Sequence, residues 1–254
     1  MPAEGVLPIA IGEATKLVNI LIHEKKVYNF TVQFGYKTAT GDAVGEIINK
    51  TNYLPTVEQC DNVCKNFLGK IKQTPSKFSA IKINGKRAYK LAREKKEFEM
   101  PSRVIEIYQL ECLEVNKNIH TATYRVECSK GTYVRTLAEA MAESMGTLCF
   151  VKKLQRESVG KFSINNALKI EDFNISITKD NLKENLLDIQ FVLEVFLYFE
   201  VSESQAKIIK NGATYFSNDL LDCEFCWLKH KGALIAIGSV SNKFFKPSRV
   251  FNIL

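Results

Sequence analysis

Residues 28–34, YNFTVQF, alternate strictly between apolar and polar side chains. A half-buried strand has this two-residue period, and its apolar face must be covered by a second layer. Related patterns predict further strands over residues 78–83, 104–113, 121–128 and 148–154. Helical spacing of apolar residues predicts helices over residues 57–68, 87–95 and 133–145. The chain is therefore expected to combine helices with a sheet.

The chain starts on an apolar run instead of the polar tail that is usual at a terminus. Residues 6–11, VLPIAI, predict a strand, and apolar residues at helical spacing follow from 17 to 22. The segment that should pair with this first strand lies elsewhere or is missing. We therefore expect the chain to begin inside a packed element.

A second unit is expected near the C-terminus, because the sequence becomes polar and rich in Asn and Asp after about residue 160. Beyond residue 196 it shows a helix over 203–210, an Asn-Gly turn at 211–212 and short strands ending at 227, at 239 and at 254. A module this small and rich in strands depends on its neighbour for stability. We expect one large domain and one small one.

Positive charge is concentrated in one window, residues 65–96. It holds eleven Lys or Arg against a single acid, Glu94, for a charge of +10, so that the net +7 of the chain leaves −3 for all other residues. Phe67, Phe78 and Tyr89 are interleaved with the basic residues. Phosphate neutralisation with base stacking uses this combination, so the window predicts a nucleic-acid surface, with a solvated lysine-rich face as the alternative.

The seven cysteines, an odd number spread through a long chain, indicate a reducing compartment and not a disulfide framework. Cys60 and Cys64 lie one helical turn apart and are expected to be core or helix-face thiols. Cys223 and Cys226 form a C-x-x-C, but no second Cys pair or nearby His pair completes a zinc site. We expect no metal at these positions.

Other features exclude several classes of protein. The sequence has no apolar run long enough for a membrane helix and no secretory signal. Its three histidines lie far apart, so they do not indicate a shared catalytic or metal site. It also has no P-loop, dinucleotide fingerprint or G-x-S-x-G. We expect a cytoplasmic monomer that uses no cofactor.

The segment CSKGTYVRT, residues 128–136, is the best candidate for a site. A strand ends there, Gly131 permits a sharp turn and a helix begins, so that Tyr133 and Arg135 project from the start of the helix. Such a junction can bind an anion through backbone N–H groups and a fixed Arg. The alternative is an Arg that pairs with a structural carboxylate.

CSKGTYVRT stands in one order with three other segments, AEGVLPIAIGEATKL, KKVYNFTVQFGYKTATGDAVGE and TPSKFSAIKINGKRAYKLAR. Together they resemble the bacterial tRNA pseudouridine synthase B (TruB) family. The likeness covers Met1 to about Phe162 and, more weakly, the C-terminal GALIAIGSVSNKFFKPSRVFNIL, which is similar to the tail of a PUA-like module. Each segment alone is a weak signal, whereas the four in order are specific.

The resemblance implies an α+β fold: a mixed, largely antiparallel sheet in a pseudouridine synthase catalytic domain, residues 1–195, with an RNA-gripping insertion at about 73–103. A β-rich PUA-like RNA-binding module would follow at 196–254. It also implies isomerisation of the T-loop uridine of tRNA, the position-55 nucleotide, to pseudouridine. The partner would be the tRNA T-stem-loop, and the reaction needs no redox cofactor or group donor.

Residue roles also follow from the resemblance. Tyr28 would stack on the uracil and take the proton from its carbon, with Tyr133 as a second wall and Leu154 as an apolar contact. Arg135 would hold the catalytic carboxylate, and Asp42 would be a second acid near the pocket. Phosphates would be bound by the basic residues of the insertion, Lys77, Lys82, Lys86 and Arg87.

One departure concerns the nucleophile. The family's catalytic aspartate is followed by two residues, here Met1 and Pro2, and then by an Ala-x-Gly-x-Leu-Pro stretch, which here is residues 3–8, AEGVLP. The aspartate is therefore expected directly before Met1, outside this chain. Glu4 lies four positions later and does not replace it. The alternatives are an enzyme whose start lies upstream, a non-catalytic tRNA-binding or tRNA-folding protein, and the product of a degraded gene.

Overall fold

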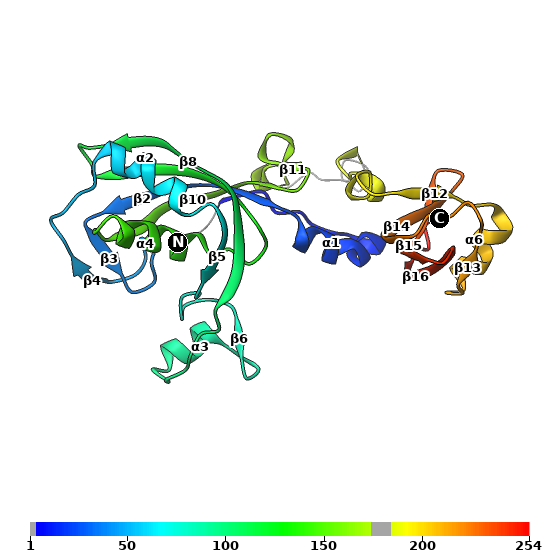
Figure 1. The fold of residues 1–254 in the computed structure, drawn as a ribbon, viewed down its shortest axis with the longest axis horizontal. Helices are drawn as coiled ribbons and strands as arrows, with labels where there is room; N and C mark the ends of the chain where they lie inside the picture. The colour runs from blue at the N-terminus through cyan, green and yellow to red at the C-terminus, as the bar shows by residue number, and fades with distance from the viewer. Residues whose placement is uncertain (1–3, 174–183, 254) are drawn as a thin grey trace. The chain divides into compact units, whose positions relative to one another are not determined.

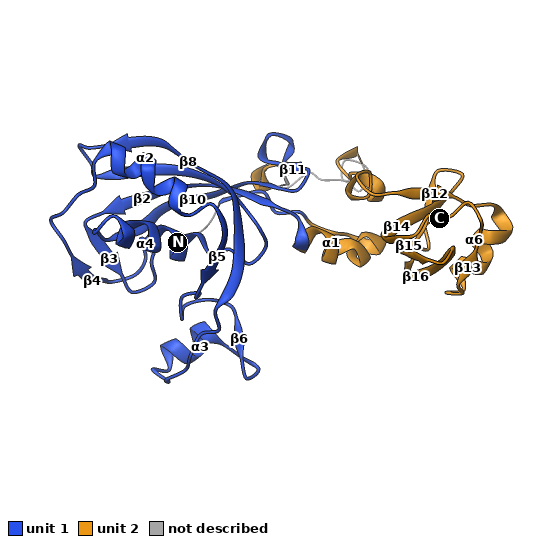
Figure 2. Cartoon of the chain, viewed as in Figure 1, with its two compact units in different colours: residues 1–8, 23–167 blue, residues 9–22, 168–254 orange. Residues whose placement is uncertain are grey.

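The computed structural model of the chain describes residues 4–173 and 184–253 (Figure 1). The chain divides into two compact units (Figure 2). Unit 1 holds the residues up to 8 and residues 23–167, and unit 2 holds residues 9–22 and 168–254. Residues 9–22 and 168–195 thus group with the C-terminal unit, whereas the sequence placed them in the larger domain.

Unit 1 is built on a seven-stranded sheet of order β1-β10-β2-β9-β8-β5, with β11 paired to β10. The strands are β1 (Glu4–Gly5), β2 (Lys26–Phe34), β5 (Gly69–Gln73), β8 (Arg103–Asn116), β9 (Thr121–Cys128), β10 (Cys149–Val159) and β11 (Phe162–Ser163). Only β1 and β10 pair in parallel; every other pair of this sheet among the described residues is antiparallel. The expected mixed, largely antiparallel α+β fold is confirmed.

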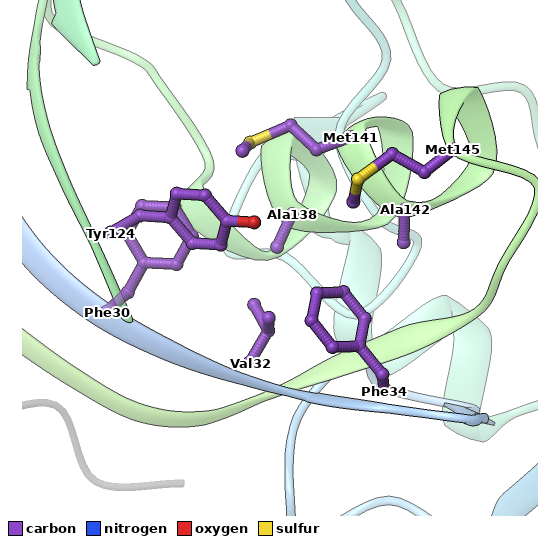
Figure 3. A pocket seen from close by; sticks show the side chains of 8 residues that line it. All are labelled: Phe30, Val32, Phe34, Tyr124, Ala138, Met141, Ala142 and Met145. Carbon is purple, nitrogen blue, oxygen red and sulfur yellow. The ribbon is translucent and has the colours of Figure 1, made fainter. Parts of the chain in front are cut away.

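Two helices, α2 (Val57–Asn66) and α4 (Val134–Ser144), share one apolar core with the sheet. The apolar face of β2, including Phe30 and Phe34, packs there with residues of β9 and β10. Figure 3 shows the side chains that line the space between the sheet and α4, with Phe30 and Tyr124 beside each other and Ala138, Met141 and Ala142 projecting from the helix. This region is packed interior. Cys60 and Cys64 are buried in the same core, so their predicted position is confirmed.

The segment between β5 and β8 forms the insertion: β6 (Lys82–Ile83), β7 (Lys86–Arg87) and α3 (Ala88–Arg93) (Figure 1). Asn84 and Gly85 both have positive φ, 47° and 82°, which is the type I′ turn that joins two short antiparallel strands. The strand expected over 78–83 is wrong except for its last two residues. Phe78 and Ser79 lie in a turn, where the Ser76 hydroxyl accepts a bond from the Phe78 amide.

The apolar run at 6–11 is not a strand, contrary to the expectation. Only Glu4–Gly5 pairs with β10, and the Val6 amide adds one further bond to the Arg156 carbonyl. Pro8 lies inside the run, and a proline has no N–H to donate to a sheet. A 3₁₀ helix, η1 (Gly12–Leu17), then leads into α1 (Val18–His23).

Two smaller strands, β3 (Tyr36–Thr38) and β4 (Ile47–Lys50), form a hairpin in unit 1. The loop between them holds residues 39–46. The Val151 amide of β10 donates to the Gly41 carbonyl in this loop at 3.0 Å. The loop is therefore fixed to the central sheet next to α4.

Unit 2 contains a five-stranded sheet of order β12-β14-β15-β16-β13. Its strands are β12 (Tyr198–Glu200), β13 (Tyr215–Phe216), β14 (Cys223–His230), β15 (Ala233–Ser241) and β16 (Phe244–Val250), and its α-helix α6 (Glu203–Lys210) begins with a Ser202–Gln205 capping box. The last strand runs from Phe244 to Val250, so the strand expected over residues 249–254 starts and ends earlier in the chain.

Residues 9–22 belong to unit 2 because Leu17 is buried with Leu193 and Phe251. The Lys16 ammonium also donates to the Val250 carbonyl at 2.8 Å. Short 3₁₀ helices complete the two units: η2 (Ile164–Asn166), η3 (Ile170–Phe173) and η4 (Ile189–Val192). No helix in residues 4–173 or 184–253 is long and apolar enough to cross a membrane.

Candidate functional site

The turn between β9 and α4 is fixed at both of its ends. At its start, the Ser129 amide donates to the Glu106 carbonyl at 2.8 Å, and the Glu106 amide donates to the Ser129 hydroxyl at 2.9 Å. Gly131 turns the chain with a φ of 80°, where a side chain would be strained and would meet the Arg103 guanidinium. The expected strand–turn–helix junction is therefore present, with Tyr133 as the residue that precedes α4.

Arg135 lies in the first turn of α4 and points at the β3–β4 loop. Its Nη1 donates to the Asp42 carboxylate at 3.0 Å and to the Thr40 carbonyl at 2.8 Å, and Nη2 donates to the Phe78 carbonyl at 3.4 Å. The Arg135 side chain retains 23% of its surface exposed. The guanidinium is thus aimed by three acceptors and is still within reach of an anion.

Asp42 is buried and accepts bonds on both carboxylate oxygens. Oδ1 accepts from the Thr40 hydroxyl at 2.7 Å and from the Val44 amide at 3.2 Å, while Oδ2 faces Arg135. Burial acts to raise the pKa of Asp42, but the bonds from Thr40 and Val44 and the charge of Arg135 offset it, and the pKa lies below its ordinary value. Asp42 is therefore an ionised partner that holds Arg135.

Tyr28 and Leu154 lie on the neighbouring strands β2 and β10 and line the same face of the sheet. In the register, Phe30 is opposite Leu154 and Tyr28 is opposite Arg156. Both Tyr28 and Leu154 are partly buried against the core. Burial raises the pKa of the Tyr28 phenol, and the Cys128 thiol acts the same way, whereas Arg156 acts to lower it. The phenol is therefore neutral in neutral solution.

Tyr133 contacts both ends of the insertion. Its amide donates to the Gln73 side-chain oxygen at 2.8 Å, and its carbonyl accepts from the Gln73 side-chain nitrogen at 3.1 Å. The Arg103 guanidinium lies over the Tyr133 ring, 5.7 Å from its centroid. Gln73 and Arg103 are paired residues of β5 and β8. The sequence identified this pair only as the limits of the insertion.

The basic residues of the insertion lie on exposed positions. Lys82 and Arg87 are directly opposite each other in the β6–β7 pair, and Lys86 is opposite Ile83. Lys77 stands apart from them, with its ammonium 5.6 Å from the centre of the Phe98 ring. Like charges opposite each other on a strand pair repel, and an anion between them removes that repulsion. The arrangement of Lys82 and Arg87 thus favours a phosphate ligand.

The predicted site residues form three groups. Arg135 and Asp42 are bonded directly, Tyr28 and Leu154 are neighbours on β2 and β10, and Tyr133 is bound by Gln73 and stacked by Arg103. Sequence reasoning missed Thr40, Gln73, Arg103 and Arg156. Arg156 could have been found, because it follows Leu154 at the two-residue strand period.

The part of the chain that the structure describes holds no cluster of three or more His, Cys, Asp or Glu residues suited to a metal ion. Cys223 and Cys226 are free thiols on β14, and burial raises the pKa of Cys226 to about 12. A thiol with this pKa is protonated and unreactive in neutral solution.

The chain is similar to known proteins over almost its whole length. Residues 1–134 match the model for the TruB family pseudouridylate synthase N-terminal domain. The tRNA pseudouridine synthase B of Rickettsia bellii (strain OSU 85-389) is 48% identical over 251 residues, which are 99% of this chain and 85% of that protein. The protein of the same name from Rickettsia akari (strain Hartford) is 46% identical over 252 residues, 99% of this chain and 86% of that protein.

Solved structures share the fold at low sequence identity. A chain of a Cbf5–Nop10–Gar1 complex matches with a TM-score of 0.67 and 18% identity, over 98% of this chain and 72% of that one. A chain of an H/ACA ribonucleoprotein bound to a substrate RNA containing 2'-deoxyuridine matches with a TM-score of 0.66 and 16% identity, over 98% and 73%. Tyr28, Asp42, Gln73 and Tyr133 lie within the residues that the family model matches, while Arg135 and Leu154 follow them.

Proposed function

Because the chain belongs to the TruB family of pseudouridylate synthases, we propose that it isomerises a uridine of tRNA to pseudouridine, and that this is the T-loop uridine at position 55. The observation that carries the proposal is the 48% identity, over 99% of the chain, to a protein named tRNA pseudouridine synthase B. The geometry of Tyr28, Arg135 and the basic insertion supports it.

The reaction breaks the bond between the sugar and a ring nitrogen of uracil and rejoins the sugar to a ring carbon, which loses its proton. The product is an isomer, so no group donor is consumed. Inside a stacked loop the bond is out of reach, and the nucleotide must be extruded into a pocket. The pocket then has to stack the base, exclude water and aim a carboxylate at the target.

Tyr28, Leu154 and Tyr133 are the residues we assign to the base. Tyr28 and Leu154 share one face of the sheet, where a ring and an aliphatic side chain can hold a planar base. The raised pKa of Tyr28 keeps its phenol protonated at neutral pH. Its role as a proton acceptor therefore requires that the phenol gives its own proton up as it takes the carbon proton, with a proton reaching the ring nitrogen that was freed from the sugar, so that the product is an isomer of the substrate.

Arg135 is the residue we assign to the catalytic carboxylate. A guanidinium can hold a carboxylate through two parallel bonds and keep it ionised. Asp42, Thr40 and Phe78 fix the guanidinium from behind, and the part of Arg135 that is still exposed is available to the nucleophile. The resemblance expects that nucleophile directly before Met1, and Asp42 serves as the anchor.

The partner is RNA, and the basic insertion supplies the grip. Lys82 and Arg87 face each other without an intervening acid, as a site for phosphate requires. We assign the catalytic role to residues 1–195, with the insertion at 73–103, and an additional RNA contact to the PUA-like residues 196–254. We also propose that the protein acts as a cytoplasmic monomer.

The test is conversion of a T-stem-loop RNA that carries a labelled uridine at the target position. The chain is compared with a version extended by the in-frame residues encoded before Met1, and a stem-loop with cytidine at the target is the control RNA. Pseudouridine formed at the target by either protein supports the proposal. Tight binding by both proteins with no conversion favours the alternative, a non-catalytic tRNA-binding or tRNA-folding protein.

A further inference from the structure

Gln73 is a buried polar residue that the proposed mechanism does not use. It ends β5, its residue surface is only 5% exposed, and its side-chain amide makes two hydrogen bonds to the backbone of a single residue, Tyr133. A buried amide of this kind is costly unless both its donor and its acceptor are satisfied. Here both are satisfied by the peptide groups of Tyr133.

Tyr133 occupies a position where a helix normally needs a capping side chain. It precedes α4, and no side-chain cap bond is made from it. Its carbonyl accepts the first bond of the helix, from the Leu137 amide at 3.0 Å, and also the bond from Gln73. Gln73 therefore holds both peptide groups of the residue that precedes α4 from another strand, and it fixes the place where α4 begins.

The start of α4 decides where two assigned side chains lie. Tyr133 carries its ring on the same residue whose peptide groups Gln73 holds. Arg135 follows two residues later, in the first turn of α4. Arg135 reaches Asp42, Thr40 and Phe78 at 2.8–3.4 Å, so a small shift of the helix start breaks these contacts. Arg103, the register partner of Gln73, restrains the same tyrosine through its ring.

We infer that Gln73 is a positioning residue of the active site: its side-chain amide fixes the Tyr133 peptide and thereby sets the Tyr133 ring and the Arg135 guanidinium. The inference rests on the proposed function for its effect on rate. It assigns Gln73 no contact with RNA and no part in proton transfer.

Gln73→Met tests the inference, because Met has nearly the same volume and neither bond. The substitution is made in whichever of the two proteins, the chain or its extended version, converts uridine. Misplacement of a positioned group by about 1 Å can cost on the order of a hundredfold in rate, so we expect a roughly 10- to 100-fold loss in the single-turnover rate with saturating protein and T-stem-loop RNA. RNA affinity should change by less than about threefold, since Gln73 is buried away from solvent.

Gln33→Met is the matched control. The Gln33 side chain also donates to two backbone carbonyls, those of Ile119 and His120, at 2.8 and 3.1 Å, and lies on β2 of the same unit. Gln33 has no role at the site, so the single-turnover rate of the Gln33→Met variant with bound RNA should equal that of the parent protein. A Gln73→Met rate within about twofold of the control, at equal folded fraction, overturns the inference.

Hydrogen exchange at the Tyr133 amide gives a readout that does not need activity. Gln73→Met removes the acceptor of this amide, and exchange should become at least roughly tenfold faster. Gln73→Glu retains the acceptor for the Tyr133 amide but not the donor to the Tyr133 carbonyl. Hydrogen exchange at the Tyr133 amide should therefore stay near the parent value, while the single-turnover rate still falls. If neither the chain nor its extended version converts the target uridine, the proposed function fails, and unchanged exchange at the Tyr133 amide in Gln73→Met would separately refute the positioning.

Discussion

The basic insertion and the start of α4 satisfy their polar groups in opposite ways. Lys82, Lys86 and Arg87 are exposed on a two-residue strand pair and repel one another. Arg135, by contrast, is held by a buried carboxylate and two carbonyls. The contrast teaches that exposed charge supplies affinity for RNA, whereas charge that is buried among fixed partners supplies rate.

The largest effect is expected at Arg135. Arg135→Lys keeps the charge but removes the planar fork, so a carboxylate is no longer held in one orientation. In the version extended before Met1, we expect a loss of roughly 100- to 1,000-fold in the single-turnover rate of bound RNA, with little change in RNA affinity. Arg125→Lys, which alters an Arg that pairs with Glu157 at 2.7 Å, is the control. A loss of affinity with normal turnover of bound RNA would show that Arg135 is a phosphate contact.

A second effect, on affinity, is expected from the insertion. Neutralising its four assigned cations, Lys77, Lys82, Lys86 and Arg87, with Gln should weaken T-stem-loop binding by roughly 10- to 100-fold. For about four neutralised phosphates, log K should fall with log salt at a slope of roughly −3 to −4, and the variant should lose most of this slope.

The control for that variant neutralises four cations elsewhere in unit 1, namely Lys25, Lys37, Lys117 and Lys152. Lys25 and Lys37 already pair with Glu127 and Glu143 at 2.7 and 3.0 Å. Equal losses of affinity and salt dependence in the two variants would remove the distinction between the insertion and the rest of the surface.

Asp42→Asn is expected to act on stability with a definite pH dependence. The folded pKa of Asp42 is below its ordinary 3.8, so the ionised form is the one stabilised by folding. That contribution is fully present above about pH 4 to 5 and is lost as the pH falls through the folded value. At pH 7 the variant should lose about 2 kcal/mol of unfolding free energy.

Urea unfolding of the parent and Asp42→Asn at pH 7, 5, 4 and 3 measures this. The difference in unfolding free energy should shrink toward the acid end, because both proteins then carry a neutral side chain. A difference that stays constant from pH 7 to 3 would mean that Asp42 acts through shape and not through its charge on Arg135.

The smallest effect is expected in the insertion turn. Gly85 has a φ of 82° and open space around the position of a Cβ, so Gly85→Ala adds backbone strain of about 1 kcal/mol and no steric contact. RNA affinity should fall by roughly two- to fivefold if the β6–β7 pair positions Lys82 and Arg87. An unchanged affinity would show that these cations bind without a formed turn.

The sequence by itself determined the elements of this protein that local periodicity specifies. The strand from Thr121 to Cys128 was predicted with its bounds, and the helix beginning near Tyr133 to within one residue, because alternating and helical burial leave distinct patterns. The strand predictions at residues 78–83 and 6–11 were wrong for most of their length, because most of the apolar residues there do not pair with a neighbouring strand. A short apolar run does not by itself decide between a strand and a turn.

Only the tertiary structure decided which polar groups meet. The bond between Arg135 and Asp42 joins residues 93 positions apart, and the bonds between Gln73 and Tyr133 span 60. Residues 9–22 pack with the C-terminal unit through Leu17 and Phe251, which no composition shift indicates. Such pairings depend on the order in which strands join the sheet, and the periodicity of a single strand carries no information about its neighbours.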